Sequence, residues 1–201
     1  MRIIVFDTET TGIYSPGLDI ESQPYICQFA SISIETDSSK SFFNEVSRIN
    51  QYINVPISMP LDCVNIHGIS NGMLEGKPIF SNVVDTILDE FGKADYAVAH
   101  NISFDKGMME CELKRLNRDL KFLPENTFDT MIETKELLNL PGRHGRIKSP
   151  RLDELYNFLF NSNMINAHNA IHDVEATVKC LFELFKREIF NPVEPSQGSL
   201  F

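Results

Sequence analysis

Residues 2–12 decide the fold and the chemistry of this chain, and they run Arg-Ile-Ile-Val-Phe-Asp-Thr-Glu-Thr-Thr-Gly. The apolar run predicts a buried strand that ends in polar residues from Asp7 onward. Side chains two residues apart at a strand end point to the same side, so Asp7 and Glu9 converge. Such a pair repels itself unless a hard cation lies between the carboxylates, and Mg²⁺ and Mn²⁺ favour oxygen ligands of this kind. An isolated pair is more often a solvated acidic turn, but the flanking strand, threonines and glycine favour a metal site.

The rest of the chain predicts a mixed α/β sheet in a single domain. Alternating or short apolar runs predict further strands at residues 26–35, near 41–46 and at 96–99. The first three strands are joined by short connections, which favour antiparallel pairing. Apolar residues at helical spacing predict helices over residues 80–91, 104–116, 130–138, 152–160 and 174–190. Strands first, then strands alternating with helices, are typical of a mixed sheet.

The net charge of −10 restricts the partners of the chain. Proteins that coat nucleic acid attract phosphate with surplus Lys and Arg, so this balance argues against a general, high-affinity DNA-coating protein. It is compatible with an enzyme that holds a few nucleotides and uses metal ions to neutralise phosphate.

The sequence also predicts a cytoplasmic protein without a membrane partner. No apolar run is long enough to cross a bilayer, and no signal peptide precedes the first strand. The cysteines lack the CxxC spacing of a zinc site and are predicted to be reduced thiols, at Cys27, Cys63, Cys111 and Cys180.

Two further acids stand where helices are predicted to begin. Asp105 follows the strand at 96–99 and lies in the first turn of the next helix, where the helix dipole favours a carboxylate. Asp173 opens the C-terminal helix, shortly after His168. Each alone is more often a helix-start or surface residue. Together with the acidic pair of the first strand, they indicate one site.

In order and context these acids resemble the DEDDh exonuclease superfamily, which includes the proofreading epsilon subunit of bacterial replicative polymerases. The resemblance runs from Ile3 to about Phe185, and it includes the segments 66–70 (Ile-His-Gly-Ile-Ser) and 128–130 (Phe-Asp-Thr). It implies a ribonuclease H-like fold, a five-stranded mixed sheet flanked by helices, in an exonuclease domain over residues 1–190.

The resemblance also implies a 3′→5′ exonuclease that releases nucleoside 5′-monophosphates from DNA ends, in proofreading or repair. Two Mg²⁺ ions, with Mn²⁺ as a substitute, would be held by four acids. In this scheme Asp7 bridges both ions, and Glu9 and Asp173 complete the shell of the first. Asp105 holds the second ion, directly or through water.

His168 matches the general base of that family by its His-x4-Asp spacing to Asp173. His172 competes for the role, but neighbouring residues on a helix point about 100° apart, which favours His168. The resemblance also implies contacts to the terminal nucleotide from Thr10, Thr11, Gly12 and Ile13, with His67, Asn101 and Phe104 as further candidates.

Two basic segments are candidates for contacts along the nucleic-acid strand. One holds Lys114, Arg115, Arg118 and Lys121, and the other holds Arg143, Arg146, Lys148 and Arg151. A solvated charged face is an equal alternative for the first segment, whereas the second lies in a Gly/Pro-rich loop and favours strand binding. An RNase or oligoribonuclease of the same superfamily, and a non-catalytic binding module of the same fold, remain open as alternatives.

The tail after Phe190 is predicted to be extended, because Pro192 and Pro195 interrupt it. It ends Gln-Gly-Ser-Leu-Phe at residues 197–201, which resembles the peptide that binds the bacterial sliding clamp. Gly198 departs from the usual leucine, so we expect weak, micromolar binding through Gln197, Leu200 and Phe201. The alternative is a tail that packs on its own domain. A DNA polymerase is a second expected partner.

Overall fold

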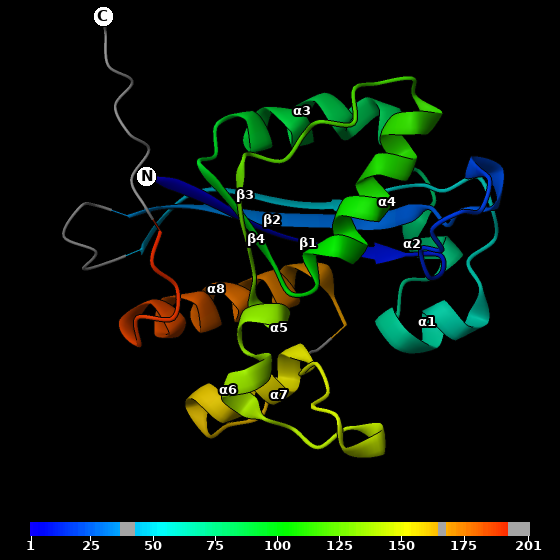
Figure 1. The fold of residues 1–201 in the computed structure, drawn as a ribbon. Helices are drawn as coiled ribbons and strands as arrows, with labels where there is room; N and C mark the ends of the chain where they lie inside the picture. Colours follow the sequence, from blue (N-terminus) through cyan, green and yellow to red (C-terminus); the bar gives the residue numbers. More distant parts are fainter. Residues whose placement is uncertain (37–42, 165–167, 193–201) are drawn as a thin grey trace, which may run out of the picture.

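A five-stranded mixed sheet forms the centre of the computed structural model, which describes residues 1–36, 43–164 and 168–192 (Figure 1). The strand order is β3-β2-β1-β4-β5. The strands are β1 (Arg2–Thr10), β2 (Ile26–Thr36), β3 (Phe43–Tyr52), β4 (Tyr96–Ala99) and β5 (Asn126–Asp129). The first three pair antiparallel, while β4 is parallel to β1 and β5 is parallel to β4. The mixed sheet predicted from the sequence is confirmed.

Helices cover both faces of this sheet (Figure 1). They are α1 (Leu61–His67), α2 (Asn71–Leu74), α3 (Phe80–Gly92), α4 (Ile102–Arg115), α5 (Thr130–Glu133), α6 (Lys135–Leu138), α7 (Leu152–Phe160) and α8 (Ala170–Lys186), with 3-10 turns η1 (Ile20–Ser22) and η2 (Arg143–Gly145). In Figure 1, α3 and α4 lie on one face, and α7 and α8 lie on the other. Within the described residues, no helix is both long enough and apolar enough to cross a membrane.

The alternation of β1 decides which side chains reach which layer. Ile4 and Phe6 point into the core shared with α3 and α4. Ile3 and Val5 point into the core shared with α7 and α8. Because the same alternation continues past Phe6, Asp7 and Glu9 follow the α8 side. The residue between them, Thr8, follows the α4 side.

The long strands differ from prediction at their ends. β1 continues to Thr10 because its polar end stays hydrogen-bonded to β2, with Thr10 opposite Ile26. β3 extends to Tyr52, well beyond the predicted 41–46, because it pairs with almost the whole length of β2. Residues 41 and 42 of that prediction lie outside the described residues.

The helices differ from prediction in three places. The helix predicted over 130–138 is two short helices, because the backbone at Thr134 leaves helical geometry. The helix predicted over 174–190 is α8, which begins four residues earlier, at Ala170, and ends at Lys186. After its end the chain turns back, and the ring of Phe190 packs against Tyr96 and Phe128. The short α1 and α2 were not predicted, since so few residues show no helical period.

Candidate metal centre and active site

Three of the predicted acids converge at the end of β1. Ligand oxygens of Asp7, Glu9 and Asp173 all lie within 4.8 Å of one another, and each side chain is half-buried. Asp7 and Glu9 come from β1, whereas Asp173 comes from the first turn of α8. Oδ1 of Asp173 is buried without a hydrogen-bond donor among the described residues. A bound cation would provide the partner that this buried oxygen lacks.

The fourth acid, Asp105, is held next to this group by the strand itself. Its carboxylate is 2% exposed, and Oδ1 accepts hydrogen bonds from the backbone N–H of Thr8 at 2.9 Å and from the Thr8 hydroxyl at 2.7 Å. Asp105 is outside the set of oxygens within 4.8 Å, yet it is close enough for its charge to raise the pKa of Asp7 and of Glu9. The structure therefore brings three of the four predicted acids into one cluster and places the fourth, Asp105, beside it.

Burial and mutual repulsion make this cluster difficult to ionise. Burial is the largest cause at each acid, and neighbouring carboxylates add to it at Asp7 and Glu9. The pKa of Asp7 is well above its ordinary value, and the pKa values of the other three rise to about 8 for Glu9, about 7 for Asp105 and about 6 for Asp173. An all-oxygen group with this much unbalanced negative charge fits a hard divalent cation.

The start of α4, which carries Asp105, depends on a residue of β5. The carboxylate of Asp129 accepts hydrogen bonds from the backbone N–H groups of Asn101 and Ile102, each at 3.0 Å. It also accepts the N–H of Met131 at 3.0 Å and so caps α5. This leaves Asn101 in the left-handed region at φ 77°. Asp129 was recognised only within the segment 128–130, and its role in orienting α4 was not predicted.

The two candidate bases face different hollows. His168 is exposed, and with Asp173, Arg151 and Met164 it lines a hollow of about 90 Å³. His172 lines a separate hollow of about 440 Å³ with Tyr156, Ser162, Asn163, Met164, Glu175, Ala176 and Lys179. Of the two histidines, His168 is thus the one that shares a hollow with a carboxylate of the acidic cluster.

A buried amide network precedes α8, and it was not predicted. Gln28 lies opposite Glu9 in the sheet and is fully buried. Its amide oxygen accepts the N–H of Ala170 at 3.3 Å, and its amide nitrogen donates to Asn50 at 2.8 Å and to Asn169 at 3.4 Å. These contacts fix the residue next to His168 against the sheet. The sequence placed Gln28 in a strand but gave no sign of this long-range pairing.

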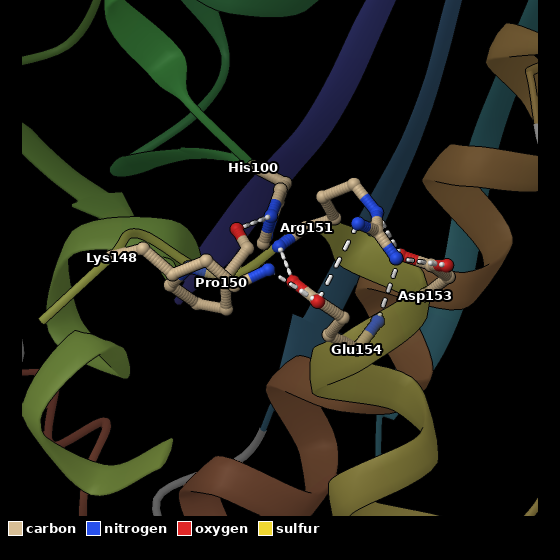
Figure 2. Close-up of polar contacts among 6 residues, drawn as sticks. All are labelled: His100, Lys148, Pro150, Arg151, Asp153 and Glu154. Carbon is tan, nitrogen blue, oxygen red and sulfur yellow. Dashed lines mark hydrogen bonds and ion pairs between the residues drawn. The ribbon is translucent and has the colours of Figure 1, made fainter. Parts of the chain in front are cut away.

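Several polar contacts hold the segment before α7 (Figure 2). Nε2 of His100 lies 3.0 Å from the carbonyl oxygen of Pro150, and Lys148 forms an ion pair with Glu154. Arg151 is bound by Asp153, with Nε 2.9 Å from Oδ1 and Nη2 3.1 Å from Oδ2. Arg151 and Asp153, which both line the small hollow with His168, are therefore held by an ion pair.

The predicted nucleotide-binding segment, residues 10–13, has one exposed apolar side chain. Ile13 is 85% exposed, whereas Thr10 and Thr11 are buried and hydrogen-bonded within the chain. His67 is also buried. Its Nε2 lies 3.3 Å from the Thr10 carbonyl oxygen, and its Nδ1 accepts the N–H of Ile69. His67 therefore contacts the backbone of Thr10 from a buried position.

The remaining residues predicted to bind the nucleotide, Asn101 and Phe104, lie at the start of α4. Asn101 stands at the start of α4 and accepts a hydrogen bond from the Ser103 hydroxyl at 3.0 Å. Phe104 is half-buried against the α3/α4 core. Gln197, Leu200 and Phe201, the predicted clamp-binding residues, lie outside the described residues.

The two basic segments differ in how many of their side chains are paired with a carboxylate. Arg115 is turned inward, and Arg118 is paired with Asp85. Lys148 and Arg151 are paired with acids of α7. All eight arginines of the sequence are described, and Arg143 and Arg146 are the two for which no carboxylate partner is found among the described residues. Both are exposed and flank the turn η2.

A mixed five-stranded sheet with an acidic cluster at the end of its central strand, completed by the starts of two flanking helices, defines a metal-dependent nuclease with a ribonuclease H-like fold. The family comparison agrees with this class. The RNase_T family model, described as "Exonuclease", matches residues 4–181, and the chain belongs to this exonuclease family. Divalent metal dependence follows from the family and from the acidic cluster.

Curated relatives carry one recurring name, DNA polymerase III subunit epsilon. The protein of Buchnera aphidicola is 33% identical over 175 residues, covering 86% of this chain and 68% of the relative. That of Rickettsia conorii is 30% identical over 203 residues, covering 98% and 80%.

Solved structures share the fold. E. coli exonuclease I in complex with a dT13 oligonucleotide has a TM-score of 0.72 at 21% identity, covering 93% of this chain. The chain spans only 41% of the length of that protein. Exonuclease X in complex with 5′ overhanging duplex DNA has a TM-score of 0.59 at 20% identity and covers 94% of both chains.

Proposed function

We propose that this 3′→5′ exonuclease removes nucleoside 5′-monophosphates from DNA ends, in proofreading or repair. The observation that carries the proposal is the convergence of Asp7, Glu9 and Asp173 within 4.8 Å, with Asp105 held beside them. The relatives named DNA polymerase III subunit epsilon and the DNA-bound structural neighbours support DNA as the substrate.

The acids would hold two Mg²⁺ ions, for which Mn²⁺ can substitute. Asp7 would contact both ions, Glu9 and Asp173 would complete the shell of the first, and Asp105 would hold the second. When bound, the ions supply positive charge that stabilises the attacking and leaving oxygens of the phosphate. The chain contributes the geometry, because β1 and α8 fix the three converging carboxylates and Thr8 fixes the fourth.

A ring nitrogen of His168 would take the proton from the attacking water, and the neighbouring hollow gives that water room. The carboxylate of Asp173 faces the same hollow, where it stabilises the histidine once the histidine has become positively charged. Thr10, Thr11, Gly12 and Ile13 would hold the terminal nucleotide, with Ile13 contacting the base. Asn101 and Phe104 would border this position, and His67 would support it through Thr10.

The strand behind the terminal nucleotide would lie along η2. Arg143 and Arg146 are exposed arginines without a carboxylate partner among the described residues, in a chain of net charge −10. Arg146 is five residues from Arg151, which lines the small hollow, so its backbone is at most about 17 Å away along an extended chain. A stacked single strand would span that maximum distance with about five phosphates.

We further propose that residues 191–201 form a tail whose Gln197, Leu200 and Phe201 bind a sliding clamp, beside a DNA polymerase in the cytoplasm. The four cysteines are free thiols, which agrees with a reducing compartment. Deleting residues 197–201 should abolish clamp binding and leave exonuclease activity on free oligonucleotides intact. Absence of clamp binding by the full chain at high micromolar concentration would rule this partner out.

The substrate assignment is tested by product analysis. DNA and RNA oligomers of the same sequence, labelled at either the 5′ or the 3′ end, are incubated with the protein and Mg²⁺ or Mn²⁺. We expect a ladder from the 5′-labelled DNA and labelled mononucleotide from the 3′-labelled DNA. Faster degradation of RNA would assign the chain to the RNases of the superfamily, and binding without cleavage would indicate a non-catalytic module.

A further inference from the structure

Arg115 stands at the end of α4, and its side chain turns beneath the connection between β1 and β2. Its guanidinium lies over the ring of Tyr25, 3.9 Å from the ring centre. Its Nη2 donates to three carbonyl oxygens, those of Ile20 at 3.1 Å, Gln23 at 2.7 Å and Pro24 at 3.0 Å. A planar, permanently charged donor is suited to this convergence of acceptors.

Glu112, one turn earlier on α4, completes the arrangement. Its carboxylate is buried, with the residue 4% exposed, and Oε1 lies 3.2 Å from Nη1 of Arg115. The same Oε1 accepts the backbone N–H of Ile26 at 2.9 Å, where β2 begins. A buried ion pair of this kind contributes little net stability. The hydrogen bonds of the pair instead join α4 to the start of β2 and to the connection before it, which gives the pair a geometric role.

Two of the residues that Arg115 contacts, Gln23 and Tyr25, are hydrogen-bonded to residues in or next to the segment proposed to bind the nucleotide. The N–H of Tyr25 donates to the Thr11 hydroxyl at 2.9 Å, and the N–H of Thr11 donates to the Tyr25 carbonyl at 2.9 Å. The Gln23 amide donates to the Ser15 carbonyl at 2.7 Å. Thr11 and Ser15 flank Ile13, the exposed side chain of the segment.

The same helix touches the segment a second time. The ring of Tyr14 lies against Gly107, so closely that a Cβ there would come within 2.5 Å of it. Gly107 is two residues from Asp105 on α4. The helix that carries a metal-binding acid is therefore also the support of the residues on either side of Ile13.

We propose that Arg115 and Glu112 are positioning residues, which fix the segment 10–13 relative to Asp105 so that a bound terminal nucleotide presents its phosphate to the acids. The inference rests on the proposed function, in which this segment binds the nucleotide. It also explains why Arg115, a candidate strand contact by sequence, is not in the solvent.

The test separates positioning from stability with a double variant. Arg115→Met alone should unfold at lower temperature, because Glu112 then remains as a buried, unpaired charge. Glu112→Gln/Arg115→Met removes that charge and keeps an acceptor for the Ile26 N–H, so its Tm should lie above that of Arg115→Met, although the three carbonyl groups still lack their donor. Arg187→Met is the matched control, since Arg187 follows α8 as an exposed arginine in an ion pair with Glu183.

For a DNA oligonucleotide with Mg²⁺, the double variant should lose about 10–100-fold in kcat/KM, mostly through KM, as expected when a binding segment is displaced by about 1 Å. Its affinity for Mn²⁺ should not change, and amide hydrogen exchange should accelerate in residues 11–25 only. Arg187→Met should behave as the wild type.

A double variant with wild-type stability and wild-type kcat/KM would overturn the inference. A loss confined to kcat and to Mn²⁺ affinity would also overturn it, since the pair would then support the metal site. Ile13→Ser distinguishes the underlying proposal. An unchanged KM for Ile13→Ser refutes the nucleotide contact itself, whereas a raised KM combined with unaffected Arg115 variants refutes only the positioning role.

Discussion

Thr8 holds Asp105 by two hydrogen bonds to one carboxylate oxygen, at 2.9 Å from its backbone N–H and at 2.7 Å from its hydroxyl. The residue between the two acids of β1 thus fixes a third acid from α4. Both bonds lower the pKa of Asp105, although burial raises it further, to about 7. The strand that supplies two candidate metal ligands therefore also positions the candidate ligand on α4.

Thr8→Val should weaken retention of the second metal ion, because the valine removes the hydroxyl donor and makes Asp105 harder to ionise. A hydrogen bond to a charged group contributes about 1.5–3 kcal/mol, so the Mg²⁺ concentration for half-maximal activity should rise about tenfold or more. Thr127→Val, the same change at an exposed position of β5, is the control. An unchanged Mg²⁺ requirement in Thr8→Val would show that this contact does not serve the metal site.

Without metal, the fold should lose stability as the pH rises through neutrality. The pKa of Glu9 is about 8 in the fold against 4.5 ordinarily, so the folded chain binds this proton more tightly than the unfolded chain does. The stabilisation is complete below about pH 4.5 and disappears as the pH approaches 8. In a chelator, the Tm should therefore fall between pH 6.5 and 8, and Glu9→Gln should flatten that fall. A Tm that rose over this range in the wild type would contradict the raised pKa.

His168→Ala should lower kcat by about 10²–10⁴, the usual effect of losing a general base, while Mn²⁺ binding is largely kept. His172→Ala should have a much smaller effect, because His172 lines a different hollow from Asp173. Single-turnover rates on the same oligonucleotide compare the two variants. The opposite order of effects would assign the base to His172.

Arg143→Ala/Arg146→Ala should weaken DNA binding and its dependence on salt. Each phosphate contact to a single strand contributes about 0.7 to the slope of log affinity against log salt, so losing two should reduce the slope by about 1.4. Arg187→Ala removes an exposed but paired arginine outside the candidate strand contacts and should leave the slope unchanged. Binding is measured by fluorescence anisotropy with Ca²⁺ in place of Mg²⁺. An unchanged slope in the double variant would place the strand elsewhere.

Local pattern was enough to predict the first four strands and to single out the acids, whereas the fifth strand, β5, followed only from the family resemblance. Contacts between distant parts of the chain were not predicted. Asp7 and Glu9 follow from the period of β1, and Asp105 and Asp173 from their positions at helix starts. The amide of Gln28 is different, because its partners Asn50 and Asn169 are brought to it by sheet register and by the packing of α8. The inward turn of Arg115 is likewise invisible in sequence, since the carbonyl groups that bind it belong to a distant connection.

The central claim is that the acids at the end of β1 hold the catalytic metal, and Asp7→Ala tests it most directly. Cleavage of 5′-labelled DNA with Mg²⁺ is measured together with the Tm in a chelator. We predict that cleavage is abolished while the Tm stays equal or rises, because the variant removes the burial of the Asp7 carboxylate and its repulsion by the neighbouring acids, which together raise the pKa of Asp7. Near-wild-type turnover by Asp7→Ala would contradict the account.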